Sequence, residues 1–169
     1  MEVTTQCDGT RGRTAGFFLP LYGTTQCIYN SRKKSHTMFE IHRNERARQL
    51  RPSLSRSWLL VRANSSEEVF EEAFESEADS IIIDLEDGCP AEEKDAAREQ
   101  VVRMLNSGVV AWVRINAITT EHWWKDVKAL KNVKGLRGVM LATAEHATDI
   151  DRTAAELPPG TPIIALIES

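Results

Sequence analysis

The stretch Ile81-Ile82-Ile83-Asp84-Leu85-Glu86-Asp87 places three apolar β-branched residues directly before a run with three carboxylate groups. The pattern of an apolar run with a polar end recurs at 109–116, where Arg114 follows the run, and at 163–168, which ends in Glu168. Short apolar strands that alternate with helices are typical of a parallel sheet covered on both faces. Ligand sites in such sheets form at the carboxyl ends of the strands. These three strand ends therefore predict an anion-binding or metal-binding site.

The spacing of apolar runs and helix signals predicts repeated strand–helix units after residue 57. Asn64-Ser65-Ser66-Glu67 is typical of a helix N-cap followed by acids, and Pro158-Pro159-Gly160 ends the last expected helix. We expect strands at 58–61, 80–84, 109–113, 138–141 and 162–167, and helices at 67–75, 90–105, 122–130 and 147–157. The inner face of the first helix should carry Val69, Phe70, Ala73 and Phe74.

The expected strands begin every 22 to 29 residues along the chain. This step matches the unit of a (β/α)8 TIM barrel, which needs eight units and about 250 residues. Only five strands and four helices are expected here. The sequence therefore predicts either an open five-stranded sheet or the first part of a barrel whose remainder is missing.

Charge and cysteine content narrow the classes of function. Residues 1–56 hold ten Lys and Arg against four acids, a net charge of +6, so the remaining 113 residues carry −10. An acidic domain of this kind is a poor nucleic-acid binder. Cys7, Cys27 and Cys89 form no CxxC pair, so no disulfide framework or zinc site is implied, and a reducing cytoplasm is the expected compartment. No run approaches the ~20 apolar residues that span a bilayer.

Residues 1–50 show no sustained hydrophobic period, and only residues 38–50 could form a short basic helix. We interpret residues 1–37 as non-core, either disordered or preceding the true start at Met38. A partner-binding arm and a transit peptide are the alternatives. A chain that starts at Met38 should then be as stable as the full chain, and limited proteolysis should trim the N-terminus up to about residue 50 first.

The segment 84–88 and Arg114 each allow two interpretations. Carboxylates at a strand end can hold Mg²⁺ or orient its waters, but an Asp-Gly pair is also ordinary turn chemistry. The guanidinium can grip a ligand carboxylate or stabilise an oxyanion. It can equally form a structural ion pair with Glu86 or Asp87, and both roles can hold together.

Three further features have a structural as well as a functional interpretation. Lys94 and Arg98, spaced i, i+4 after two glutamates, favour a solvated charged face of a helix. Glu168 ends an apolar run, where a carboxylate is costly unless paired or metal-bound, but it is also an exposed terminal residue on the simplest interpretation. His122-Trp123-Trp124 could cover a pocket, although aromatic residues at a helix start more often pack against the core.

Six blocks of sequence, taken in order, resemble the citrate lyase β-subunit family of HpcH/HpaI-type aldolases, which is related to the phosphoenolpyruvate/pyruvate barrel enzymes. The blocks are Arg56-Ser57-Trp58-Leu59-Leu60-Val61, the run from Ala78 to Gly88, Lys94 with Ala97-Arg98, Val113-Arg114-Ile115-Asn116, Gly138-Val139-Met140-Leu141 with Glu145, and Ala165-Leu166-Ile167-Glu168. The resemblance covers residues 56–169, whereas residues 1–50 match nothing comparable.

The resemblance implies a TIM barrel and a Mg²⁺-dependent carbon–carbon lyase. The implied substrate is a 3-hydroxyacyl-CoA such as citryl-CoA or malyl-CoA, or a related 2-oxo-acid aldol. Complete members are implied to be homo-oligomers, with no nucleic-acid or membrane partner. The implied catalytic residues are Arg114, Glu86 and Asp87, and the two acids would hold the waters of the metal. Arg114 and Glu168 are implied to bind the substrate, and Glu168 also the metal. Lys94 and Arg98 are implied to support these residues.

The chain departs from the family pattern at two positions. Arg62-Ala63 replaces a Pro-Gly or Pro-Ala pair after the first strand, and Ala142-Thr143 replaces a Pro-Lys pair after the fourth. The family's second metal-ligating aspartate belongs to a segment beyond residue 169. A catalytically inactive fragment or a binding-only paralogue is therefore the alternative hypothesis. For this chain alone we expect weak or absent Mg²⁺ binding and no lyase turnover.

Overall fold

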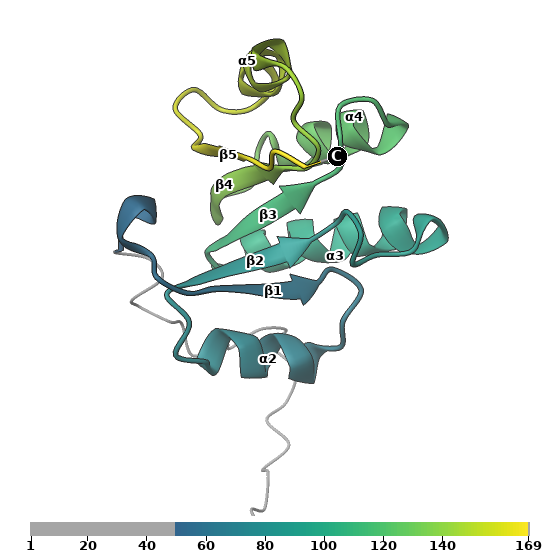
Figure 1. Ribbon diagram of the computed structural model, residues 1–169. Helices are drawn as coiled ribbons and strands as arrows, with labels where there is room; N and C mark the ends of the chain where they lie inside the picture. The colour runs from purple at the N-terminus through teal and green to yellow at the C-terminus, as the bar shows by residue number, and fades with distance from the viewer. Residues whose placement is uncertain (1–49, 169) are drawn as a thin grey trace, which may run out of the picture. The chain divides into compact units, whose positions relative to one another are not determined.

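Five parallel strands lie side by side in chain order in the computed structural model, which describes residues 50–168 (Figure 1). The strands are β1 (Trp58–Arg62), β2 (Ser80–Asp84), β3 (Ala111–Ile115), β4 (Leu136–Leu141) and β5 (Ile163–Ala165). They alternate with helices α2 (Glu67–Glu75), α3 (Lys94–Asn106), α4 (Glu121–Leu130) and α5 (Ala147–Glu156), and short 3-10 turns occur at η1 (Pro52–Leu54) and η2 (Ala91–Glu93). The predicted series of strand–helix units is confirmed.

Most of the predicted bounds agree with the structure to within two residues. The largest difference is in the second expected helix, which is a 3-10 turn before α3 begins at Lys94. β5 is also shorter than expected. Pro90 itself has an extended backbone, so the α-helix cannot begin there. Ser66 holds the N-cap position of α2 but makes no side-chain capping bond. The expectations for residues 1–49 fall outside the described residues.

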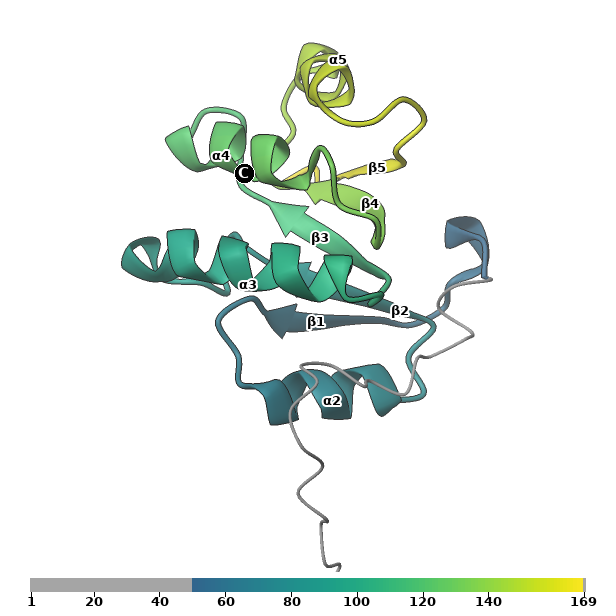
Figure 2. The same ribbon diagram turned by 180° about the vertical axis from the view of Figure 1, so that it is seen from behind.

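The hydrophobic core lies between one face of the sheet and the helices that cover it. Figure 2 shows α3 and α4 in front of the strands when the molecule is seen from behind. Every second strand residue points into this core, and the largest fully buried side chains there include Ile81, Ile83, Val113, Ile115 and Leu141 from strands and Phe70, Val101, Leu105 and Leu130 from helices. Val69 lies on the side of α2 that faces β1, but it is 45% exposed because it lines a pocket there and is not part of the buried core.

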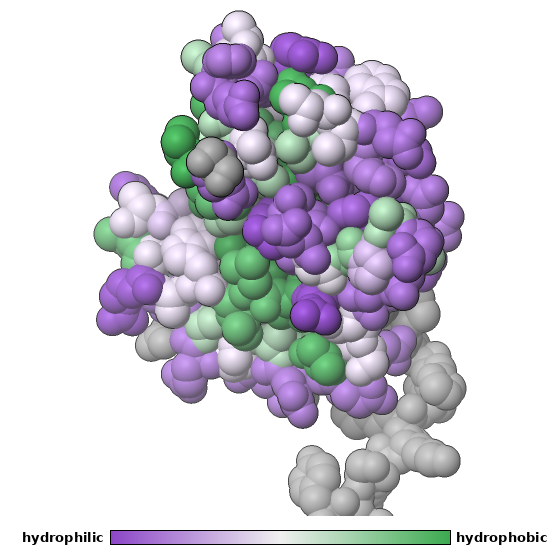
Figure 3. All heavy atoms as spheres, turned by 45° about the vertical axis from the view of Figure 1, so that its right-hand side comes forward, coloured by the Kyte–Doolittle hydropathy of each residue, from purple (hydrophilic) through white to green (hydrophobic). Residues whose placement is uncertain are grey.

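The opposite face of the sheet carries the alternate residues and is only partly filled. Trp112 is buried and meets Trp58 edge to face, with ring centroids 5.3 Å apart. A Cβ on Gly138 would lie 2.4 Å from the Trp112 ring, so this position has no room for a side chain. Leu60, next to this pair, stays 47% exposed. An apolar patch surrounded by polar side chains is visible in the space-filling view (Figure 3).

We expect the chain expressed alone to be oligomeric or poorly soluble. Within the described residues, β1 and β5 each pair with a strand on one side only, and open apolar edges promote pairing between chains. Sedimentation velocity should therefore show species larger than a monomer. Leu60→Lys should increase the monomer fraction, whereas Leu54→Lys, on the exposed turn η1, should not. A monodisperse monomer that melts cooperatively would contradict this expectation.

No helix within residues 50–168 is both long enough and apolar enough to cross a membrane.

Candidate functional site

Arg114 and Asp84 form a bidentate ion pair at the carboxyl ends of β3 and β2. Arg114 Nε donates to Asp84 Oδ1 at 2.7 Å, and Nη2 donates to Oδ2 at 2.6 Å. The same two carboxylate oxygens accept the backbone N–H groups of Glu86 at 2.9 Å and Gly88 at 2.8 Å. The strand register sets up the pair, because the Cα atoms of Asp84 and Arg114 are direct partners. The arginine is therefore held in one orientation by a carboxylate that is itself fixed by the following loop.

The protonation of this pair follows from its contacts. Burial raises the pKa of Asp84, but the hydrogen bonds from Arg114 and from two backbone N–H groups outweigh burial and leave the pKa below its ordinary value. The hydrogen bond to Asp84 raises the pKa of Arg114. The pair is thus charged throughout the neutral range. The segment 84–88 is a turn closed by Asp84, which is one of its two predicted interpretations. That its carboxylates hold Mg²⁺ or orient its waters stays a prediction.

Glu86 lies beside the pair, with its Oε2 3.4 Å from Arg114 Nη1. This oxygen is buried and accepts no hydrogen bond from the described residues. Burial raises the pKa of Glu86, and the neighbouring charge of Asp87 adds to the effect. The predicted ion pair between Arg114 and Glu86 is present, but the main partner of the arginine is Asp84, which sequence reasoning did not assign to it.

We expect Glu86→Gln to stabilise the fold at neutral pH. A raised pKa means that folding disfavours the charged carboxylate, so the charge costs stability at any pH well above the raised value. The increase in stability of Glu86→Gln over the wild type can be measured as a shift in the midpoint of urea unfolding. This increase should shrink as the pH falls through the pKa of Glu86 in the folded state, and it should vanish below the ordinary pKa of 4.5. Glu92→Gln, on the exposed turn η2, should show no such dependence. A loss of stability on Glu86→Gln at pH 8 would contradict the argument.

A buried lysine supports the loop that follows β2. Lys94 is 7% exposed, and its Nζ donates to the backbone oxygens of Leu85 and Glu86, both at 2.6 Å, and to Asn116 Oδ1 at 2.8 Å. The ammonium group thereby donates hydrogen bonds to two backbone carbonyls that lie beyond the end of β2. The predicted solvated helix face is wrong for Lys94 and for Arg98, which is equally buried, because α3 packs this side against the sheet.

Asp126 on α4 is the centre of the same buried network. It is fully buried, and it accepts Arg98 Nε at 2.8 Å, Asn116 Nδ2 at 2.7 Å and the Asn116 backbone N–H at 3.0 Å. Burial raises its pKa, although these donors oppose the shift. Sequence reasoning missed Asp126. The available signal was an aspartate at an inward helical position, three residues after Trp123 and directly before Val127, both buried.

The other predicted acids are solvent-exposed. Asp87 follows Glu86 in the loop, and Glu168 lies three residues beyond the end of β5. Within residues 50–168, no three His, Cys, Asp or Glu side chains are grouped so that they could hold a metal. The free buried oxygen of Glu86 is a hard ligand of the kind that Mg²⁺ prefers. The residues at this edge therefore fit a magnesium ion as part of a ligand set.

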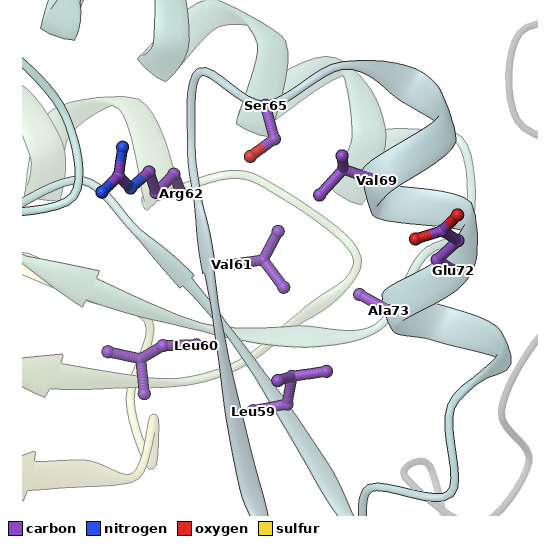
Figure 4. Close-up of a pocket in the computed structure, with 8 residues that line it drawn as sticks. All are labelled: Leu59, Leu60, Val61, Arg62, Ser65, Val69, Glu72 and Ala73. Atoms are coloured by element: carbon purple, nitrogen blue, oxygen red, sulfur yellow. The ribbon is translucent and has the colours of Figure 1, made fainter.

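A pocket of about 390 Å³ lies between β1 and α2 (Figure 4). Its lining is mainly apolar and consists of Leu59, Leu60, Val61, Arg62, Ser65, Val69, Glu72 and Ala73. Figure 4 shows Leu59 and Val61 pointing toward α2, while Leu60 and Arg62 point to the other side of the strand. The pocket borders the unpaired edge of β1, and we assign the chemistry to the charged cluster because the convergent polar groups lie there.

Comparisons with known proteins identify the family of the chain. Residues 56–169 match the model of the HpcH/HpaI aldolase/citrate lyase family. The chain is 32% identical over 109 residues to a (3S)-malyl-CoA thioesterase of Cereibacter sphaeroides, a match that covers 62% of this chain and 38% of that protein.

Two solved structures from Mycobacterium tuberculosis are similar in fold as well as sequence. The citrate lyase beta subunit complexed with oxaloacetate and magnesium is 32% identical, with a TM-score of 0.54 over 66% of this chain and 47% of that chain. Protein CitE in complex with magnesium, acetoacetate and coenzyme A is 32% identical, with a TM-score of 0.56 over 69% of this chain and 41% of that chain. The chain thus spans half or less of the length of these relatives. With its five strands matching part of their barrel and its family model matching from residue 56 onward, the chain belongs to the HpcH/HpaI aldolase/citrate lyase family.

Proposed function

We propose that residues 56–168 supply half of the active site of a magnesium-dependent carbon–carbon lyase. The substrate class is a 3-hydroxyacyl-CoA such as citryl-CoA or malyl-CoA, or a related 2-oxo-acid aldol. The observation that carries the proposal is the cluster of Arg114, Asp84 and Glu86 at the carboxyl ends of two neighbouring strands. The relatives bound to oxaloacetate, magnesium and coenzyme A, together with the malyl-CoA thioesterase, support this substrate class.

Arg114 is suited to bind an oxyanion because Asp84 fixes it without exhausting its donors. A guanidinium has five N–H groups, and two of those of Arg114 donate to Asp84, so three remain. Within residues 50–168, the partner recorded for Nη1 is Glu86 at 3.4 Å. In retro-aldol cleavage a general base takes the hydroxyl proton and the oxygen becomes the carbonyl of the 2-oxo acid. The carbon–carbon bond breaks, its electron pair forms an enolate, and the enolate carbon then takes up a proton. Arg114 would donate to the oxygen on which negative charge develops.

Glu86, Asp87 and Glu168 are the acids proposed to serve the metal. A bound magnesium ion would neutralise charge on the 2-oxo-acid product and on the enolate. Glu86 and Asp87 would hold its waters, and Glu168 would ligate it. Lys94 and Arg98 would have a supporting role. Lys94 holds the loop after β2 by donating to the carbonyls of Leu85 and Glu86, and Arg98 donates to Asp126 in the same buried network.

A chimeric barrel tests the proposed function. Residues 56–168 would replace the matching half of the M. tuberculosis citrate lyase beta subunit, and cleavage of citryl-CoA and malyl-CoA would be measured with and without magnesium. We expect magnesium-dependent cleavage by the chimera and none by the 169-residue chain alone. A chimera that folds, by circular dichroism and a cooperative melt, yet cleaves neither substrate would reject the proposal. Cleavage by the chain alone would show that no further half is needed.

A binding-only role is the second candidate. It is favoured by the exposed position of Glu168 and by the absence, within residues 50–168, of three grouped metal-ligating side chains. In that case the chimera would bind oxaloacetate without cleaving either thioester. Binding and turnover measured on the same chimera therefore separate the two candidates.

A further inference from the structure

Arg62 lies in the same row of residues as the proposed catalytic pair. It is the last residue of β1, its Cα is the register partner of Asp84, and Asp84 is in turn the partner of Arg114. Residues paired in this way across parallel strands share one face of the sheet. With neighbouring strands about 4.8 Å apart, the Cα atoms of the two arginines lie roughly 10 Å apart. Two cations thus flank one carboxylate at the edge where ligands bind.

The positive charge of Arg62 has no counter-charge in the part of the chain that the structure describes. Both oxygens of Asp84 are taken by Arg114 and by two backbone N–H groups, and Glu86 pairs with Arg114. Arg62 is exposed, and no acid among residues 50–168 lies within ion-pair distance of it. A cation in this place adds an unpaired positive charge to an edge whose acids Asp84 and Glu86 are both engaged by Arg114.

The stem of Arg62 is packed although its head is exposed. A Cβ on Gly88 would lie 3.2 Å from Arg62 Cγ and 2.3 Å from Asp84 Oδ2, so the stem runs along the backbone of the 84–88 loop. The absence of a side chain at residue 88 lets loop, carboxylate and arginine approach one another. The guanidinium of Arg62 therefore projects from a supported position, which lowers the entropy lost when a ligand binds.

We propose that Arg62 is a second anion-binding residue of this site, and that it selects ligands with two anionic groups. Arg114 would bind one group and Arg62 the other, either a distal carboxylate of the acyl part or a phosphate. This proposal rests on the proposed function and narrows its substrate class.

Calorimetric titration of the 169-residue chain at low ionic strength and without magnesium tests the proposal. The probes are malate with two carboxylates, acetate with one, and inorganic phosphate. We expect malate to bind at least tenfold more tightly than acetate, and Arg62→Gln to weaken malate binding about tenfold while acetate binding is unchanged. Arg62→Lys should retain part of the affinity. Arg103→Gln, an exposed arginine at the far end of α3, is the matched control and should change nothing.

The outcomes separate this proposal from the proposed function. Weaker phosphate binding by Arg62→Gln with unchanged malate binding would support the site and assign the second anion to a phosphate. If Arg62→Gln changes the binding of neither malate nor phosphate, the role of Arg62 is overturned. A wild-type chain that binds neither malate nor phosphate would overturn it as well. Arg62-dependent malate binding together with an inactive chimera would reject the lyase and keep the anion site.

Discussion

Arg114→Lys in the chimeric barrel is expected to lower turnover by about two orders of magnitude. The guanidinium both grips Asp84 through two parallel hydrogen bonds and keeps N–H groups for the substrate oxygen. A lysine is a compact point charge that cannot fill both roles at once. The measurement is kcat for malyl-CoA cleavage at saturating magnesium. The melting temperature should change far less than the rate, since lysine keeps a positive charge beside Asp84.

Arg103→Lys is the control, because this side chain is exposed on α3 and its weak pair with Glu99 spans 3.8 Å. A loss of less than threefold on Arg114→Lys would remove Arg114 from the proposed chemistry.

Glu168→Gln should abolish both the activity and its dependence on magnesium if Glu168 is the metal ligand. Turnover by Glu168→Gln that still depends on magnesium would assign the ligand elsewhere.

Asp126→Ala is expected to destabilise the fold by about 3–5 kcal/mol. Asp126 is fully buried, and its removal leaves Arg98 buried without that partner and leaves the backbone N–H of Asn116 without an acceptor. Breaking a buried pair by removing one partner costs much more than the net energy of the pair. The Asp95 carboxylate that Arg98 keeps is exposed and does not replace the buried acceptor. Urea unfolding at neutral pH, followed by circular dichroism, measures the change.

Asp95→Ala is the matched control, because Asp95 pairs with the same Arg98 at 2.6 Å but its side chain is 69% exposed. The Asp95 carboxylate stays solvated, so its pair with Arg98 should contribute much less to stability than the buried pair, and the loss on Asp95→Ala should be severalfold smaller. Asp126→Asn should cost less than Asp126→Ala because the amide oxygen still accepts one hydrogen bond. Equal losses for Asp126→Ala and Asp95→Ala would contradict the view that the network depends on burial.

The sequence predicted the strands and helices because their signals are local. The run Ile81-Ile82-Ile83 before a charged turn, and the inward face formed by Phe70, Ala73 and Phe74, follow from period-2 and period-3.6 patterns within a few residues. Parallel strands that run the same way must also end at one edge. The meeting of Arg114 and Glu86 at that edge was therefore foreseeable from the sequence.

Partners across elements were decided only by the tertiary structure. The register between β2 and β3 makes Asp84 the main partner of Arg114, with Glu86 second at 3.4 Å. A shift by one residue would turn Asp84 and Arg114 to opposite faces of the sheet. Helix packing likewise buries Lys94 and Asp126, whose charge alone favoured solvent. Local sequence determines which side chains share a face of one element. Which of them meet depends on contacts between residues far apart in the chain, because each burial or pairing is set by the neighbouring element.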